Sequence, residues 1–173
     1  MPMPHPIKLL PMLSLFGLLI PGNCLALSTD RDQPAHFIAD KFQTNQKTGI
    51  TIFTGHVQMD QGTTHLTADK VTVYNGEHGR INKAIAVGAP AHYSTLPDNE
   101  KKNRMMDAYG KTIEYYPQLR KAVILGDGIV IQGPNRLNGE HIIYELDKQL
   151  ATSLPTGTAQ SVLVLQPQDL PGQ

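Results

Sequence analysis

Apolar and polar residues alternate along most of the chain, which is the pattern of β-strands with one buried face. Between residues 51 and 59, for example, Thr51, Phe53, Val57 and Met59 share one parity. The same spacing recurs at Val71 and Val73; Ile85, Val87, Ala89, Ala91 and Tyr93; Ile113 and Tyr115; Val123, Leu125, Ile129 and Ile131; Ile142, Tyr144 and Leu146; and Val162 and Val164. After residue 26 no segment keeps the 3.6-residue period of an amphipathic helix. The pattern therefore predicts an all-β, antiparallel domain.

A degenerate repeat suggests how these strands are arranged. Ala39-Asp40-Lys41 recurs as Ala68-Asp69-Lys70, and looser copies follow at 108–111 and 137–140. Each copy precedes a strand, a polar turn and a second strand, and three of these second strands end on Gly55, Gly88 or Gly126. Glycine accepts the distorted backbone of a bulge or corner. Repeated strand pairs that bend at one level predict an elongated, open β-jelly-roll.

The first residues have the features of a secretory signal peptide. Lys8 precedes an apolar run, residues 9–20, and the small-residue triplet Cys24-Leu25-Ala26 follows it. This order predicts a cleaved segment 1–26 and export of the rest of the chain. A membrane anchor is the alternative, but the run is shorter than the roughly 20 residues of a spanning helix. We expect a flexible lead-in over 27–34, the domain over 35–165 and a disordered tail over 166–173.

Composition argues against several kinds of activity. The 15 Lys and Arg residues balance the 15 Asp and Glu residues, so nothing favours nucleic acid, whose binding depends on neutralising phosphates. The histidines after residue 26 are scattered rather than spaced as metal ligands. Neither a G-x-S-x-G elbow, a Walker loop nor an H-E-x-x-H motif occurs. We therefore expect no enzyme activity, no cofactor and no metal site.

Four segments carry a recognisable sequence motif. They are residues 53–62 (FTGHVQMDQG), residues 66–74 (LTADKVTVY), residues 106–115 (MDAYGKTIEY) and residues 122–126 (AVILG). These segments resemble the LptA/OstA-like family of lipopolysaccharide transport proteins. The resemblance covers about residues 32–165 and implies that the exported chain is in the periplasm. It implies an antiparallel β-jelly-roll whose groove takes the acyl chains of lipopolysaccharide, and molecules joined head to tail into a bridge. The partners it implies are an LptC-like inner-membrane component and an LptD-like outer-membrane component.

Shared parity along each strand selects the residues expected to line that groove, since alternate residues face one side. They are Ala35, Phe37, Thr51, Phe53, Val57, Met59, Leu66, Ile85, Val87, Tyr93, Ile113, Tyr115, Val123, Leu125, Ile129, Ile131, Ile142 and Tyr144. The alternative interpretation is that these residues form an ordinary closed hydrophobic core. Many are of medium or small size, which leaves room for acyl chains.

The first and last strands are expected to be unpaired edges, which invite strand addition from another chain. The edge residues are Ala35, Phe37, Ile38, Val162, Leu163, Val164 and Leu165. Pairing of the last strand of one molecule with the first strand of the next predicts head-to-tail oligomers. Two alternatives stay open: a β-module that binds only protein through its edges, and the LptC-like inner-membrane component of the same pathway.

Overall fold

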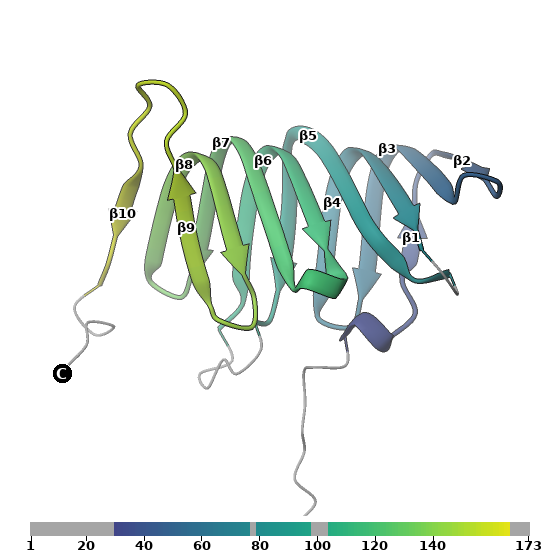
Figure 1. Cartoon of the computed structure of the whole chain (residues 1–173), viewed down its shortest axis with the longest axis horizontal. Coiled ribbons are helices and arrows are strands. Elements are labelled where there is room, and N and C mark those ends of the chain that lie inside the picture. The colour runs from purple at the N-terminus through teal and green to yellow at the C-terminus, as the bar shows by residue number, and fades with distance from the viewer. Residues whose placement is uncertain (1–29, 77–78, 98–103, 167–173) are drawn as a thin grey trace, which may run out of the picture.

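The computed structural model describes residues 30–76, 79–97 and 104–166 (Figure 1). The predicted signal peptide and residues 167–173 of the predicted tail lie outside the described residues. The described residues form one ten-stranded sheet in which every paired strand is antiparallel. The prediction of an antiparallel all-β fold is confirmed.

Six long strands, β3 to β8, build the body of the sheet, and two short strands flank it at each end. In chain order the elements are η1 (Asp30–Asp32), β1 (His36–Ile38), β2 (Lys41–Asn45), β3 (Ile50–Gln61), β4 (Thr64–Asn75), β5 (Ile81–Thr95), β6 (Met106–Tyr116), η3 (Pro117–Leu119), β7 (Lys121–Gln132), β8 (Asn135–Glu145), β9 (Leu150–Leu154) and β10 (Val162–Val164). Part of the predicted lead-in forms η1, where the Asp30 carboxylate accepts a hydrogen bond from the backbone N–H of Thr63 at 2.9 Å.

The sheet is folded over along one line, so each long strand crosses two layers (Figure 1). The ladder shifts register near the middle of every long-strand pair, between Thr54 and Val57 on β3, for example, and between Leu125 and Gly128 on β7. Such bulges bend a strand and increase its twist. The predicted bend at one level is therefore confirmed, and we call it the fold line.

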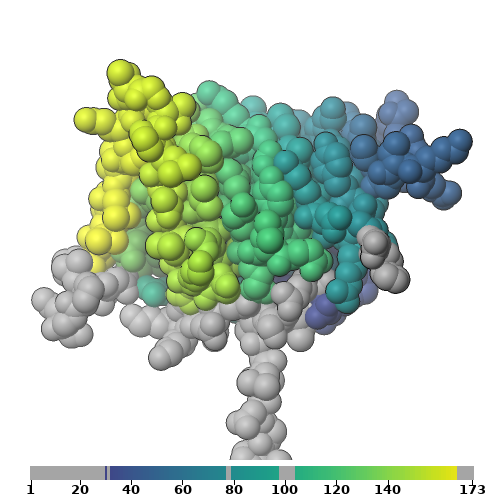
Figure 2. Space-filling view, in the orientation of Figure 1, coloured from purple at the N-terminus to yellow at the C-terminus, as the bar shows by residue number. Residues whose placement is uncertain are grey.

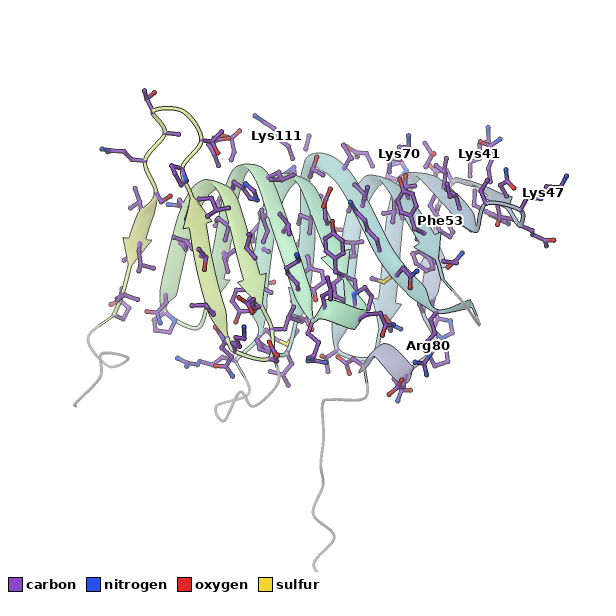
Figure 3. The ribbon with its side chains drawn as sticks, viewed as in Figure 1. Lys41, Lys47, Phe53, Lys70, Arg80 and Lys111 are labelled. Atoms are coloured by element: carbon purple, nitrogen blue, oxygen red, sulfur yellow. The ribbon has the colours of Figure 1, made fainter. Side chains whose placement is uncertain are left out.

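The fold line divides the sheet into two layers that carry different edge strands. The front layer runs from β2 to β9, and the back layer runs from β1 to β10. Opposite the fold line, the hairpin turns of the two layers lie along one margin, which we call the seam (Figure 1). Figure 3 places Lys70 and Lys111 at the fold line and Arg80 at the opposite margin.

Two glycines on the fold line adopt backbone conformations that favour glycine. Gly55 has φ of 80° and Gly126 has φ of 74°, and each is followed by a residue that also has positive φ, His56 or Asp127. A Cβ atom on Gly55 would lie 2.2 Å from an oxygen of Asp40, on the chain between β1 and β2. Gly55 thus allows the bend of β3 and the close approach of the preceding segment.

The two ends of the sheet are open, and each presents two edges instead of the single edge predicted. β1 and β2 both pair only with β3, whereas β9 and β10 both pair only with β8. Figure 2 shows the blue N-terminal strands and the yellow C-terminal strands at opposite ends of the body. The sequence analysis did not predict the front-layer edges β2 and β9. Each arises because the chain folds back within a terminal segment and adds a second short strand to the same neighbour.

Replacement of Gly55 by alanine tests the fold line. We expect Gly55→Ala to lower the free energy of unfolding by about 2 kcal/mol or more, because left-handed backbone strain adds to the contact with Asp40. Gly157→Ala is the matched control, since Gly157 has φ of 61° and open space around its Cβ position. Urea unfolding should give a loss of only about 1 kcal/mol there. Equal losses would contradict the steric role of Gly55.

Candidate functional site

The space between the two layers is the candidate site, and its part near the fold line is apolar. Cross-strand partners face the same side of a sheet, so the register identifies the inward residues. In the front layer these include Phe53, Val71, Ala86, Ile113, Ile124 and Ile142; in the back layer they include Met59, Leu66, Tyr93, Ala108, Val130 and Leu137. All except Phe53, which is half-buried, are buried in one continuous cluster. The space between the layers is thus apolar and is filled by the protein's own side chains.

Towards the seam, the inner surface of the back layer gains polar side chains. Its last inward row contains Gln61, Thr64, Thr95 and Gln132, with the apolar Met106 between the last two, and all of these except Gln132 are buried. The hydroxyls of Thr64 and Thr95 lie 3.0 Å apart, and the Gln61 amide donates to the carbonyl of Gln33 at 3.0 Å. Hydrogen-bonding groups therefore border the apolar interior at the seam in the back layer, whereas the front layer stays apolar there, for example at Val73, Ala84 and Leu146.

Tyrosines connect the two layers near this polar row. The ring of Tyr93 in the back layer lies 5.3 Å, centroid to centroid, from the ring of Tyr115 in the front layer. The hydroxyl of Tyr144 in the front layer donates to Oε1 of Gln132 in the back layer at 2.9 Å. These contacts are made by side chains alone, so they can be exchanged without breaking the ladder of either layer.

The N-terminal mouth of the interior is aromatic and the C-terminal mouth is aliphatic. Phe37 of the back layer stacks on Phe53 of the front layer with centroids 4.4 Å apart, and Phe42 continues the group at 66% exposure. At the other mouth Leu163 and Leu165 are 58% and 50% exposed. Exposed apolar side chains at both ends indicate surfaces that another molecule covers.

Most of the predicted groove residues do face the interior. They are Ala35, Phe37, Thr51, Phe53, Val57, Met59, Leu66, Tyr93, Ile113, Tyr115, Ile142 and Tyr144. Ala35 lines a hollow of about 580 Å³ at the N-terminal end of the seam, beside Gln61, Arg80 and Ile81. Whether these side chains contact lipid stays a prediction.

Six predicted groove residues face outwards instead, and two of them lie on β5. Ile85 and Val87 pair with Glu114 and Thr112, on the outer face, and Val87 is 45% exposed. The inward positions are Ala84 and Ala86. The prediction was wrong because the bulge between Val87 and Ala91 changes the inward parity within the strand.

The other four, Val123, Leu125, Ile129 and Ile131, lie on β7, whose two faces are both apolar. Their even-numbered neighbours Ala122, Ile124 and Val130 are the buried inward residues. Alternation cannot select a face where every residue is apolar, so the prediction for these four was wrong. Only the partners on β6 and β8 could have corrected it. Ile129 and Ile131 line an outer, largely apolar groove of about 660 Å³, together with Pro90, Tyr109 and Arg136.

Three histidines on the polar surface of the described residues lie in separate pairs. His56, His65 and His92 each pair with one carboxylate, from Asp40, Asp60 and Asp107 respectively. Within the described ranges, no group of three or more His, Cys, Asp or Glu side chains is placed to hold a metal ion. In that same part of the chain, no helix is long and apolar enough to span a membrane.

The comparison with protein families identifies this fold. Residues 36–150 match the model described as "LptA/(LptD N-terminal domain) LPS transport protein". The chain belongs to this family. The matched residues run from β1 to the start of β9, so the family match covers the two-layered interior and both N-terminal edges.

Individual LptA-family proteins agree with the match. The lipopolysaccharide export system protein LptH of Pseudomonas aeruginosa is 34% identical over 142 residues, covering 80% of each chain. The lipopolysaccharide export system protein LptA of Escherichia coli strain K12 is 28% identical over 159 residues, covering 91% of this chain and 83% of that protein. The crystal structure of LptH, a periplasmic component of the transport device, superposes with a TM-score of 0.72 at 30% identity, covering 80% of this chain and 99% of that one.

Adjacent residues on β7 test the corrected facing of this strand. We expect Ile124→Ala to lower the free energy of unfolding by about 3 kcal/mol, because it leaves a cavity in the interior. Leu125→Ala should cost about 1 kcal/mol, because this side chain lies on the half-exposed outer face. Urea unfolding of both variants measures the difference. A larger loss for Leu125→Ala would restore the parity predicted from the sequence.

Proposed function

We propose that this protein carries lipopolysaccharide through the periplasm, with the acyl chains held between its two layers. The observation that carries the proposal is the continuous apolar cluster between the two layers, which is bordered at the seam by the buried polar side chains of Gln61, Thr64 and Thr95 in the back layer. An apolar interior with a polar border matches an amphiphile whose chains point inwards and whose headgroup stays at the margin. The family match and the names of the related proteins support the same cargo.

Burial of the acyl chains supplies the binding energy. Each methylene removed from water contributes about 0.8 kcal/mol. Because the protein's own side chains fill the interior, lipid has to replace contacts between the layers, and part of this gain is spent on separating them. A carrier of this kind does no covalent chemistry. Directional movement then depends on energy supplied by another component of the pathway.

The open ends support assembly into a bridge. Along the path from β1 to β10 the strands alternate in direction, so β10 of one molecule meets β1 of the next in antiparallel orientation. The same holds for β9 and β2 in the front layer. A head-to-tail junction would therefore continue both layers and align neighbouring interiors. By the same edges the ends would join an LptC-like component at the inner membrane and an LptD-like component at the outer membrane.

Export is part of this proposal, because the cargo moves between two membranes. Residues 1–26 would direct the chain to the periplasm and be removed after Ala26. This arrangement separates the proposed carrier from an LptC-like component, which would keep its N-terminal segment in the inner membrane.

Photo-crosslinking from neighbouring positions on β3 tests the cargo and its location. A photoreactive amino acid at Phe53, which faces the interior, should give a covalent adduct with lipopolysaccharide in living cells. The same group at Ile52 should give little or none, because Ile52 faces outwards. Immunoblotting of the adducts for lipopolysaccharide measures both. A module that binds only protein would give no lipid adduct at either position.

Charges on the last strand test the junction. We expect the double variant Leu163→Asp, Leu165→Asp to fold but to stay monomeric, because the two side chains are exposed in the single molecule and would be buried in a junction. Leu119→Asp is the control, since Leu119 is 64% exposed on η3, away from both ends. Light scattering across a concentration series should show oligomers for the control and for the unmodified protein. Equal oligomerisation of all three would refute edge pairing.

A further inference from the structure

Three tyrosines stand at one depth of the interior, between the oily part and the polar row. Tyr93 lies two residues before the end of β5, and Tyr115 and Tyr144 each lie one residue before the end of β6 and β8. Their exposed fractions are 0%, 6% and 2%. A tyrosine joins an apolar ring to a polar tip, which suits a boundary between hydrocarbon and hydrogen-bonding groups.

The hydroxyls of these tyrosines lie among the polar groups of the seam. Tyr144 donates to Gln132, and the Tyr115 hydroxyl has Thr64 and Arg120 as neighbours. Burial raises the pKa of Tyr93 well above its ordinary value, and it raises the pKa of Tyr115 as well. Both hydroxyls therefore keep their protons at neutral pH and remain hydrogen-bond donors.

The buried hydroxyl of Tyr93 lies near the hydroxyls of Thr64 and Thr95, but it makes no hydrogen bond of normal geometry with any of the described residues. The nearby hydroxyls of Thr64 and Thr95 bond to each other instead, at 3.0 Å. A buried polar group without a partner is costly, and natural proteins retain few of them. The Tyr93 hydroxyl is therefore available to donate a hydrogen bond to a ligand, and it lies beside the polar side chains of the seam.

We propose that Tyr93, flanked by Tyr115 and Tyr144, binds the carbonyl oxygens that join acyl chains to the headgroup of the lipid. This inference rests on the proposed function and assigns the depth at which the cargo sits. The rings contact the first methylenes of the chains, and the Tyr93 hydroxyl donates to an ester or amide carbonyl. Without lipid, the Tyr93–Tyr115 ring contact and the Tyr144–Gln132 hydrogen bond hold the layers together.

A neutral carbonyl fits this position better than a charged phosphate. The hydroxyls of Thr64 and Thr95 near Tyr93 are uncharged, and the aliphatic residues Leu66 and Ala108 are its cross-strand partners. The charged group that acts on Tyr93 is the carboxylate of Asp30, which disfavours a second anion, whereas Arg120 lies beside Tyr115. Burying an anion in such surroundings would require charged partners. The phosphates of the headgroup would then lie outside the tyrosine row, at the seam.

Removal of one oxygen atom tests the assignment. Tyr93→Phe should leave the thermal midpoint of the lipid-free protein unchanged or raised, because it deletes an unpaired buried hydroxyl. It should weaken lipopolysaccharide binding about three- to tenfold, the value of one hydrogen bond. Binding of dodecyl maltoside, whose alkyl chain has no carbonyl at its junction, should not change. Fluorescence titration of the purified full-length protein measures both ligands.

Tyr109→Phe is the matched control, because Tyr109 lies on the outer face and stacks on His92. It should bind lipopolysaccharide like the unmodified protein. Unchanged lipopolysaccharide binding by Tyr93→Phe would overturn the inference, and so would equal weakening for both ligands, which indicates a general packing defect. A lower thermal midpoint for Tyr93→Phe would also count against it. Failure of the unmodified protein to bind lipopolysaccharide would instead refute the proposed function itself.

Discussion

The shared bend of the long strands is the constraint on which the rest of the structure depends. Each long strand, from β3 to β8, shifts register at the same level, so the sheet is folded instead of flat. The bend places the two halves of every long strand face to face and creates the interior. Because the bend is made in the backbone, the two layers stay hinged along one line while their opposite margins are joined by side chains.

Because the layers are joined at the fold line and separate at the seam, the interior has two different margins. Most side chains between the two layers are apolar, and hydrogen bonds among the inward side chains lie near the seam, where Thr64 bonds to Thr95 and Tyr144 bonds to Gln132. A lipid placed between the layers would follow the same order. The elongation of the sheet adds a second axis, along which the open ends extend the interior from one molecule to the next. The order of side chains from the fold line to the seam would thus determine which lipid binds, and the long axis of the sheet would be the direction in which the lipid moves.

Several features follow from the sequence because they are local. Period-2 alternation identified the strands, and the glycines at the ends of repeated strands identified the fold line, since positive φ at Gly55 and Gly126 is a property of single residues. The inward faces of β3, β6 and β8 also followed, because each of these strands has one clearly apolar face around residues such as Met59, Ile113 and Ile142.

Other features required the tertiary structure because they depend on partners distant in the chain. The facing of β5 was decided by a bulge, and that of β7, apolar on both sides, by its register with β6 and β8. The polar residues Gln61, Thr64 and Thr95 were not predicted, because the sequence analysis selected only apolar positions. Their role depends on the tyrosines that the fold places near them. Alternation in the sequence determines that a strand has two faces; only pairing decides which face is inside.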